Sequence, residues 1–124
     1  MMKFCTAIAC MDGRIQEPVL EYIKKKTGCE YVDMITDPGP VKALSDDKNS
    51  DYFESVLESV CISTEKHGSR RVFIAGHHDC AANPVEKALH VQQIKKSVAR
   101  IQSKMHDVAC YGLYVNENWQ CEPV

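Results

Sequence analysis

The chain has 124 residues, of which 44% are hydrophobic and 26% charged, as in an ordinary globular protein. Its 15 basic and 17 acidic side chains give a formal net charge of −2, and the absence of a basic stripe argues against nucleic-acid binding. The length predicts a single domain over residues 1–124, and no apolar segment approaches the length of a membrane span.

The first half of the chain predicts two buried strands, each followed by sequence that favours helices. Both strands are short apolar runs, and they end at the turn-forming pairs Asp12-Gly13 and Pro38-Gly39. Helices are favoured where apolar residues recur at helical spacing, with Gly28 as a natural helix end. In chain order we expect a strand at residues 3–9, a helix at 18–27, a strand at 30–35, a polar connector with short helical turns at 41–50 and a helix at 51–67.

The second half predicts a strand, one long helix and two closing strands. Asn83 suits the start of the helix, because Asn is a good N-cap and Glu86 follows at the position of a capping box. His90 falls on this helix and, like His67 and His106, is expected to face solvent. The predicted elements are a strand at residues 71–75, the helix at 83–105, a strand at 108–115, a turn at 116–118 and an edge strand at 119–124.

Strands that alternate with helices predict an α/β fold with a mostly parallel sheet and helices on both faces. Cys10 follows the first strand, and His77 and Cys80 follow the third. Ligands bind to such sheets at the carboxyl ends of the strands, where the strand order reverses. These three side chains can share one metal ion only if strands one and three are neighbours. We therefore expect the strand order 2-1-3-4, with a short C-terminal edge strand.

Cys10, His77 and Cys80 together offer two thiolates and one imidazole, a donor set that suits zinc. Three protein ligands and one open position are typical of a catalytic zinc site, where a metal-bound hydroxide forms near neutral pH. Asp12 leaves two alternatives open. It either closes the site as a fourth ligand, or it pairs with Arg14 and accepts a hydrogen bond from the hydroxide, so that the pair gates activity.

The other cysteines and histidines have simpler interpretations. Seven cysteines at spacings that suggest no disulfide framework favour a reducing cytoplasm. A lone cysteine at a strand end is often a small buried hydrophobe, and no C-x-x-C supports a thiol redox protein. His78 cannot readily share an ion with its neighbour His77, so we expect it to line a pocket or the surface, with Asp79 capping a turn. The cysteines expected to be core thiols are Cys5, Cys29, Cys61, Cys110 and Cys121.

The motif C-x-D-x-R at residues 10–14, paired with H-x-x-C at residues 77–80, resembles that of the β-class carbonic anhydrases. The resemblance implies Zn²⁺ bound by Cys10, His77 and Cys80. It also implies a gating dyad formed by Asp12 and Arg14. The implied activity is that of a carbonate dehydratase, a lyase that reversibly hydrates carbon dioxide, its small-molecule substrate, to bicarbonate. The implied assembly is a homodimer or a higher homo-oligomer.

Two departures in the motifs, together with the expected absence of the family's N-terminal helical arm before Cys10, make this a short, divergent member. Thr36-Asp37-Pro38-Gly39 stands where the family has Arg-Asn-Ala-Gly, and Ala81 replaces a family glycine. These departures predict an altered pocket wall beside an intact metal site. They keep two alternatives open: a zinc hydrolase of another small linear substrate, such as carbonyl sulfide or carbon disulfide, and a non-catalytic, zinc-stabilised binding module.

Overall fold

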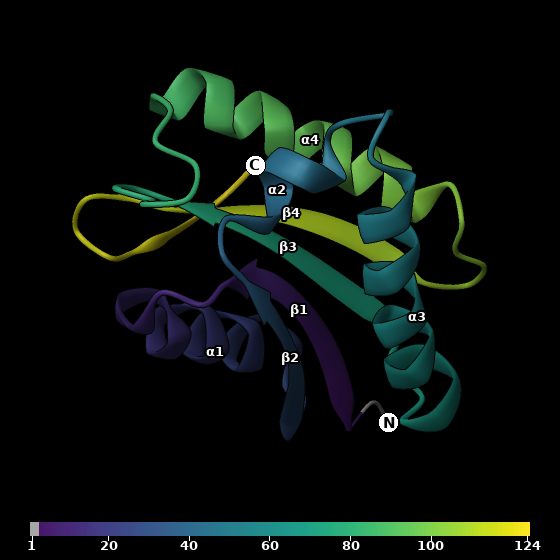
Figure 1. Cartoon of the computed structure of the whole chain (residues 1–124). Coiled ribbons are helices and arrows are strands. Elements are labelled where there is room, and N and C mark those ends of the chain that lie inside the picture. The colour runs from purple at the N-terminus through teal and green to yellow at the C-terminus, as the bar shows by residue number, and fades with distance from the viewer. Residues whose placement is uncertain (1–2) are drawn as a thin grey trace.

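The computed structural model describes residues 3–124 and shows a five-stranded sheet between two layers of helices (Figure 1). The strand order β2-β1-β3-β4-β5 confirms the predicted order and the C-terminal edge strand. The first four strands are parallel, and β5 pairs antiparallel with β4. The elements are β1 (Phe4–Cys10), α1 (Gly13–Thr27), β2 (Tyr31–Asp37), α2 (Pro40–Leu44), α3 (Ser50–Lys66), β3 (Arg71–His77), α4 (Lys87–Gln102), β4 (Ala109–Val115) and β5 (Cys121–Pro123).

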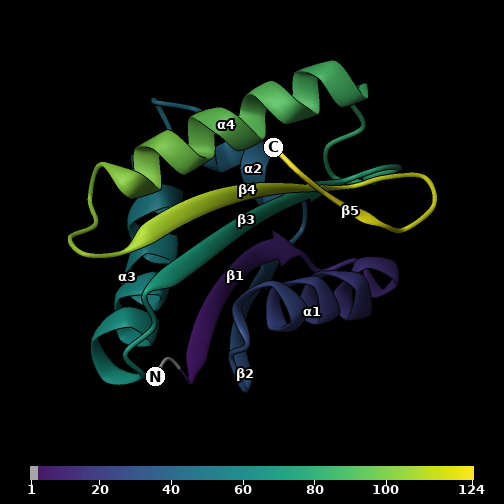
Figure 2. The ribbon, with the colours of Figure 1, turned by 180° about the vertical axis from the view of Figure 1, so that it is seen from behind.

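Each face of the sheet has its own hydrophobic core. Helix α1 covers one face, and α2, α3 and α4 cover the other (Figures 1 and 2). Side chains alternate along β1, so that Ala7 contributes to the core under α1 and Ile8 to the core under the other helices. A strand buried on both faces explains the continuous apolar runs in the sequence. Within the described residues, no helix combines the length and apolar character needed to cross a membrane.

Helix α1 begins at Gly13, and the predicted start at Pro18 is wrong. Asp12 is the N-cap, and its carboxylate accepts the backbone N–H of Arg14 at 2.9 Å. The Gln16 side chain donates to the carbonyl oxygen of Asp12 at 2.7 Å and fixes the same turn. Pro18 lies inside the helix, where its missing N–H forgoes one helical hydrogen bond. The cap therefore outweighs the proline and places the start of α1 directly after β1.

Helix α4 begins at Lys87, so the predicted N-cap at Asn83 is also wrong. The Asn83 side chain is buried and donates to Oε1 of Gln93 at 2.7 Å, which leaves it unable to cap the helix. His90, expected to face solvent, is only 1% exposed. It packs edge-on against the ring of Tyr114, with 5.7 Å between the ring centroids. Contacts between the loop, α4 and the sheet thus override the local capping signal.

We predict that Gly76→Ala destabilises the fold. A Cβ at position 76 of β3 would lie 2.5 Å from Nε2 of His90 and 2.8 Å from Cδ1 of Ile94. Overpacking of this kind typically costs about 1–3 kcal/mol in the free energy of unfolding. Urea unfolding of metal-free protein should show a lower midpoint. Gly13→Ala is the control, because its Cβ would meet nothing within 4 Å, and equal midpoints for the two variants would contradict the prediction.

Candidate metal centre

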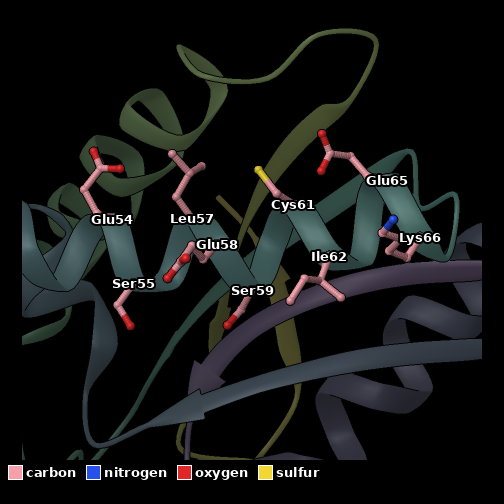
Figure 3. A pocket seen from close by; sticks show the side chains of 9 residues that line it. All are labelled: Glu54, Ser55, Leu57, Glu58, Ser59, Cys61, Ile62, Glu65 and Lys66. Atoms are coloured by element: carbon pink, nitrogen blue, oxygen red, sulfur yellow. The ribbon is translucent and has the colours of Figure 1, made fainter.

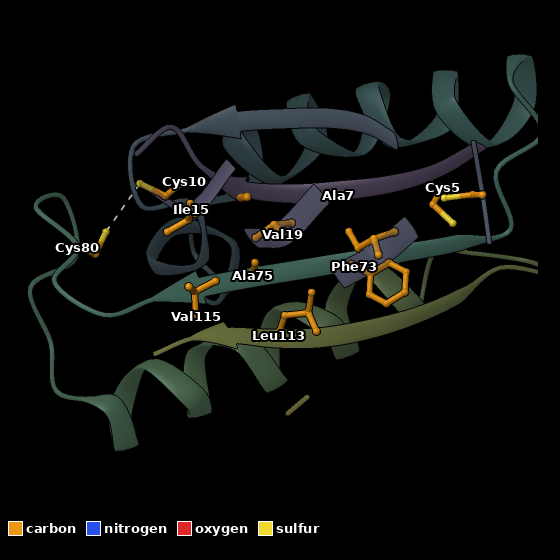
Figure 4. Packing of buried hydrophobic residues seen from close by; sticks show 13 residues of the cluster. Cys5, Ala7, Cys10, Ile15, Val19, Phe73, Ala75, Cys80, Leu113 and Val115 are labelled. Carbon is orange, nitrogen blue, oxygen red and sulfur yellow. Dashed lines mark hydrogen bonds between the residues drawn. The ribbon is translucent and has the colours of Figure 1, made fainter. Parts of the chain in front are cut away.

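Three side chains that can bind a metal meet at the carboxyl ends of β1 and β3. Cys10 ends β1, His77 ends β3, and Cys80 follows in the next loop. Because β1 and β3 are parallel neighbours, their carboxyl ends lie at the same edge of the sheet. One potential ligand atom from each residue lies within 4.8 Å of the other two. Figure 4 shows the sulfurs of Cys10 and Cys80 directed toward one another.

The donor atoms have the spacing that zinc needs, and the imidazole nitrogen that would bind it is available. The two sulfurs are 4.0 Å apart, and two sulfurs on a tetrahedral zinc ion with bonds of about 2.3 Å would lie about 3.8 Å apart. Nδ1 of His77 donates to the carbonyl oxygen of His78 at 2.7 Å. Nε2 of His77 is buried without a partner among the described residues, and burial lowers the His77 pKa, which favours the neutral, metal-binding form. The three residues therefore fit a zinc ion.

The loops beside the cluster affect the charge state of both sulfurs. Gly39 donates its N–H to the Cys10 sulfur at 3.4 Å. Burial raises the pKa of the Cys80 thiol, and the neighbouring Cys10 raises it further. The backbone of Asn83 and Ala82 acts in the opposite direction and lowers this pKa. The loops around the cluster thus offset part of the cost of a buried thiolate, the form in which cysteine binds metal.

Asp12 is paired with Arg14 and does not join the cluster. Nη2 of Arg14 donates to Oδ2 of Asp12 at 2.7 Å, and Nε donates to Oδ1 at 3.1 Å. These bonds hold the Asp12 pKa at about 2, below its usual range. Within residues 3–124, the potential metal-binding group contains Cys10, His77 and Cys80 alone. Of the two alternatives left open by the sequence, the structure has the one in which Asp12 pairs with Arg14.

Two further residues hold Arg14, and sequence reasoning missed both. Nη1 of Arg14 donates to Oδ2 of Asp79 at 3.1 Å, and Nη2 donates to the Asp79 carbonyl oxygen at the same distance. The guanidinium carbon also lies 4.6 Å from the centre of the Trp119 ring. His78 is exposed and packs edge-on against the same ring at 6.3 Å. No local pattern signals these contacts, since they join three separate segments of the chain.

A cavity reaches the cluster, and a larger hollow lies elsewhere. The cavity beside Cys80 has a volume of about 410 Å³, and His78, Asp79, Lys87 and Tyr114 are among the residues that line it. The larger hollow, of about 620 Å³, lies on the outer surface of α3 and is lined by α3 alone (Figure 3). It includes none of the three clustered ligands, so the cavity beside Cys80 is the relevant one.

The sheet is mostly parallel, and a buried Cys-His-Cys cluster lies where its strand order reverses. These features define an α/β protein with a potential transition-metal site. The chain belongs to the family described as "Putative carbonic anhydrase", whose model matches residues 1–124. This family and the shared fold confirm the resemblance to β-carbonic anhydrases that the two motifs predicted. No curated protein matches the sequence.

Solved carbonic anhydrases share the fold at low sequence identity. β-Carbonic anhydrase isoform I from Trichomonas vaginalis is 16% identical with a TM-score of 0.65, over 98% of this chain and 82% of that one. Carbonic anhydrase from Streptococcus mutans is 18% identical with a TM-score of 0.60, over 99% and 82%. The β-carbonic anhydrase CafD from Aspergillus fumigatus is 11% identical with a TM-score of 0.59, over 100% and 90%. These likenesses establish the fold.

We predict that Arg14→Gln lowers the stability of the metal-free fold above pH 3.8 and makes that stability less dependent on pH. Because Arg14 lowers the Asp12 pKa from 3.8 to about 2, their pairing stabilises the fold fully above pH 3.8. That contribution is lost as the pH falls toward 2. Urea unfolding between pH 2 and 5 should show that removing Arg14 lowers stability at pH 5 and flattens its dependence on pH. Arg70→Gln, on an exposed arginine, is the control, and identical pH profiles for both variants would contradict the prediction.

Proposed function

We propose that this chain binds one zinc ion through Cys10, His77 and Cys80 and catalyses the reversible hydration of carbon dioxide to bicarbonate. Membership of the carbonic anhydrase family supports the reaction. The observation that carries the proposal is a buried cluster of three ligands from which Arg14 withholds the Asp12 carboxylate. Three protein ligands with a free fourth position are the pattern of catalytic rather than structural zinc.

A zinc ion held by Cys10, His77 and Cys80 would supply a nucleophile near neutral pH, because zinc lowers the pKa of a coordinated water molecule to about 7. The chain's own residues orient that water. Asp12, with a pKa of about 2, stays ionised at neutral pH and accepts a hydrogen bond from the attacking water. Arg14 holds Asp12 away from the metal position and so keeps the gate open. Burial of Cys10 and His77 limits access of bulk water to the reacting centre.

A second candidate keeps the metal chemistry but changes the substrate to carbonyl sulfide or carbon disulfide. The observation that favours it is the position of Asp37, which stands in the segment where the family has Arg-Asn-Ala-Gly. Its carboxylate accepts the hydroxyl of Tyr52 at 2.9 Å, and its carbonyl accepts the N–H of Met11, next to Cys10, at 3.0 Å. The backbone of Asp37 therefore lies beside the residue that follows Cys10, in a segment with different chemistry from the family pattern.

We further propose that the protein is a single domain that works as a homodimer or higher homo-oligomer in the cytoplasm. The two cores on one sheet support the single domain. Met11, 62% exposed beside Cys10, and Leu89, 42% exposed, are large apolar side chains that a second subunit could cover. The Sordaria macrospora β-carbonic anhydrases of the same fold are described as tetrameric. Seven cysteines without a disulfide support a reducing compartment.

We predict that Cys10→Ala, His77→Ala and Cys80→Ala each lose both zinc and activity. Metal analysis should give one zinc per unmodified chain and much less than one per variant, because removing one of three ligands leaves too few to retain the ion. Stopped-flow hydration of carbon dioxide from pH 7 to 9 should fall to background. Cys61→Ala is the control, since Cys61 is half-buried on α3 and apart from the cluster.

The same assays separate the rival functions. Turnover of carbonyl sulfide or carbon disulfide without hydration of carbon dioxide selects the second candidate. One tightly held zinc with no turnover of any of these substrates selects a non-catalytic, zinc-stabilised module. An unmodified chain that binds no zinc contradicts all three.

We predict that Asp12→Asn retains one zinc per chain but lowers kcat/KM for carbon dioxide by about 10²- to 10⁴-fold, the usual contribution of a positioned acid–base group. Asn keeps the shape and the cap but carries no charge to orient the attacking water. Asp46→Asn is a matched control, because Asp46 accepts the N–H of Lys48 at 2.9 Å just as Asp12 accepts that of Arg14. Equal activity of the two variants would remove Asp12 from the mechanism.

A further inference from the structure

Asn83 is a buried polar residue to which the proposed mechanism gives no part. It lies in the loop between Cys80 and α4 and is 1% exposed. Its Nδ2 donates to Oε1 of Gln93 at 2.7 Å and faces Nε2 of His90 at 3.4 Å. Both partners are on α4, so one side chain ties the loop to the helix. Burying an amide with these bonds intact is tolerable, whereas removing its partners would leave buried polar atoms without hydrogen bonds and destabilise the loop.

The backbone of Asn83 holds the residue that offers the second sulfur. Its N–H donates to the carbonyl oxygen of Cys80 at 3.3 Å. Its carbonyl accepts the N–H of Val85 at 2.8 Å, which closes the loop on the side of α4. A displacement of Asn83 would therefore move the backbone of Cys80 and, with it, the Cys80 sulfur.

The same loop packs against the segment that holds the first sulfur. Gly39 has φ +50°, and a Cβ there would lie 3.2 Å from the Cβ atoms of both Ala82 and Asn83. Gly39 also donates its N–H to the Cys10 sulfur at 3.4 Å. Gly39, which bonds to the Cys10 sulfur, is thus packed against the loop that carries Cys80. The two sulfurs lie 4.0 Å apart in this arrangement.

His90 extends this support to the third ligand. It is 1% exposed and packs so closely on Gly76 that a Cβ there would lie 2.5 Å from its Nε2. Gly76 immediately precedes His77 on β3. Because Nε2 of His90 accepts from Asn83, the ring proton resides on Nδ1, which has no partner within the described part of the chain. Helix α4 therefore contacts the chain on both sides of the H-x-x-C motif, through His90 at Gly76 and through Gln93 at Asn83.

We infer that Asn83 is a positioning residue of the metal centre, which fixes the Cys80 sulfur relative to Cys10 and His77 by anchoring the loop 80–83 to α4. The inference rests on the proposed zinc site. The capping pattern at Asn83 also agrees with this inference, because the folded chain does not use it to start α4. Asn83 and Glu86 have the spacing of a capping box, but α4 starts at Lys87 and the Asn83 side chain bonds to Gln93 instead.

The test measures zinc affinity and cobalt spectra in full-length variants. Asn83→Ala removes the anchor, and Asn83→Leu keeps a similar volume but offers no hydrogen-bonding group to Gln93. Competition with a chromophoric chelator should show zinc binding about 10- to 100-fold weaker in both, the usual cost of losing a residue that supports a metal ligand. In cobalt-substituted protein, the thiolate charge-transfer and d–d bands should shift, because the Cys80 sulfur has moved.

Ser97→Ala is the matched control. Ser97 is also a buried polar residue of α4, but it bonds to the carbonyl oxygens of Gln93 at 2.8 Å and Val41 at 3.4 Å, away from the loop. Its zinc affinity and cobalt spectrum should match those of the unmodified chain. Changes in Ser97→Ala as large as those in Asn83→Ala would reduce the effect to general loss of stability and overturn the inference.

Gln93→Leu keeps the test decisive where the Asn83 variants do not fold. It removes the partner of Asn83 from a half-buried position without altering the loop. Weaker zinc binding with a cobalt spectrum shifted in the same direction supports the inference, and affinity and spectrum equal to those of the unmodified chain overturn it. An unmodified chain that binds no zinc overturns the proposed metal site. That result differs from tight zinc binding that is unchanged in the Asn83 and Gln93 variants, which overturns only the role of Asn83.

Discussion

The structure depends on one constraint, the parallel pairing of β1 with β3. Thr6, Ala7 and Ile8 pair with Val72, Phe73 and Ile74, and this register brings the carboxyl ends of the two strands to the same edge. Every other strand is added outside this pair, with β2 beside β1 and β4 beside β3. The strand order therefore reverses between β1 and β3, and the loops that follow them diverge to opposite faces of the sheet. A site that draws ligands from both loops can form only there.

This arrangement places polar atoms where a hydrophobic core would otherwise be. Cys10 and His77 are buried, and Nε2 of His77 has no partner within the described residues. A buried polar atom without a hydrogen bond costs free energy, so the metal-free cluster opposes folding. The N–H of Gly39, which is directed at the Cys10 sulfur, offsets part of this cost. In the proposed zinc form the ion satisfies the three donor atoms together, and its binding energy adds to the stability of the fold.

The sequence specifies the sheet and the cluster more clearly than the ends of the helices. Strand order follows from Cys10, His77 and Cys80, because residues that must share one ion restrict which strands can be neighbours. The start of α4 is predicted wrongly because the capping pattern at Asn83 and Glu86 is local, whereas the side chain of Asn83 bonds to Gln93 in the folded chain. His90 illustrates the same limit. Its burial depends on Gly76, whose missing side chain leaves the space, and only the packed structure reveals that pairing.

Arg14 shows what a short motif leaves out. The C-x-D-x-R pattern indicates the pairing of Asp12 with Arg14, but it contains no information about Asp79 or Trp119. The structure holds the guanidinium at three points, through the Asp12 carboxylate, the Asp79 carboxylate and carbonyl, and the Trp119 ring. Two of these three anchors do not involve Asp12. Arg14 is therefore held in place by more than its motif partner, and the Asp12 carboxylate that it pairs with is fixed as well by its role as the N-cap of α1.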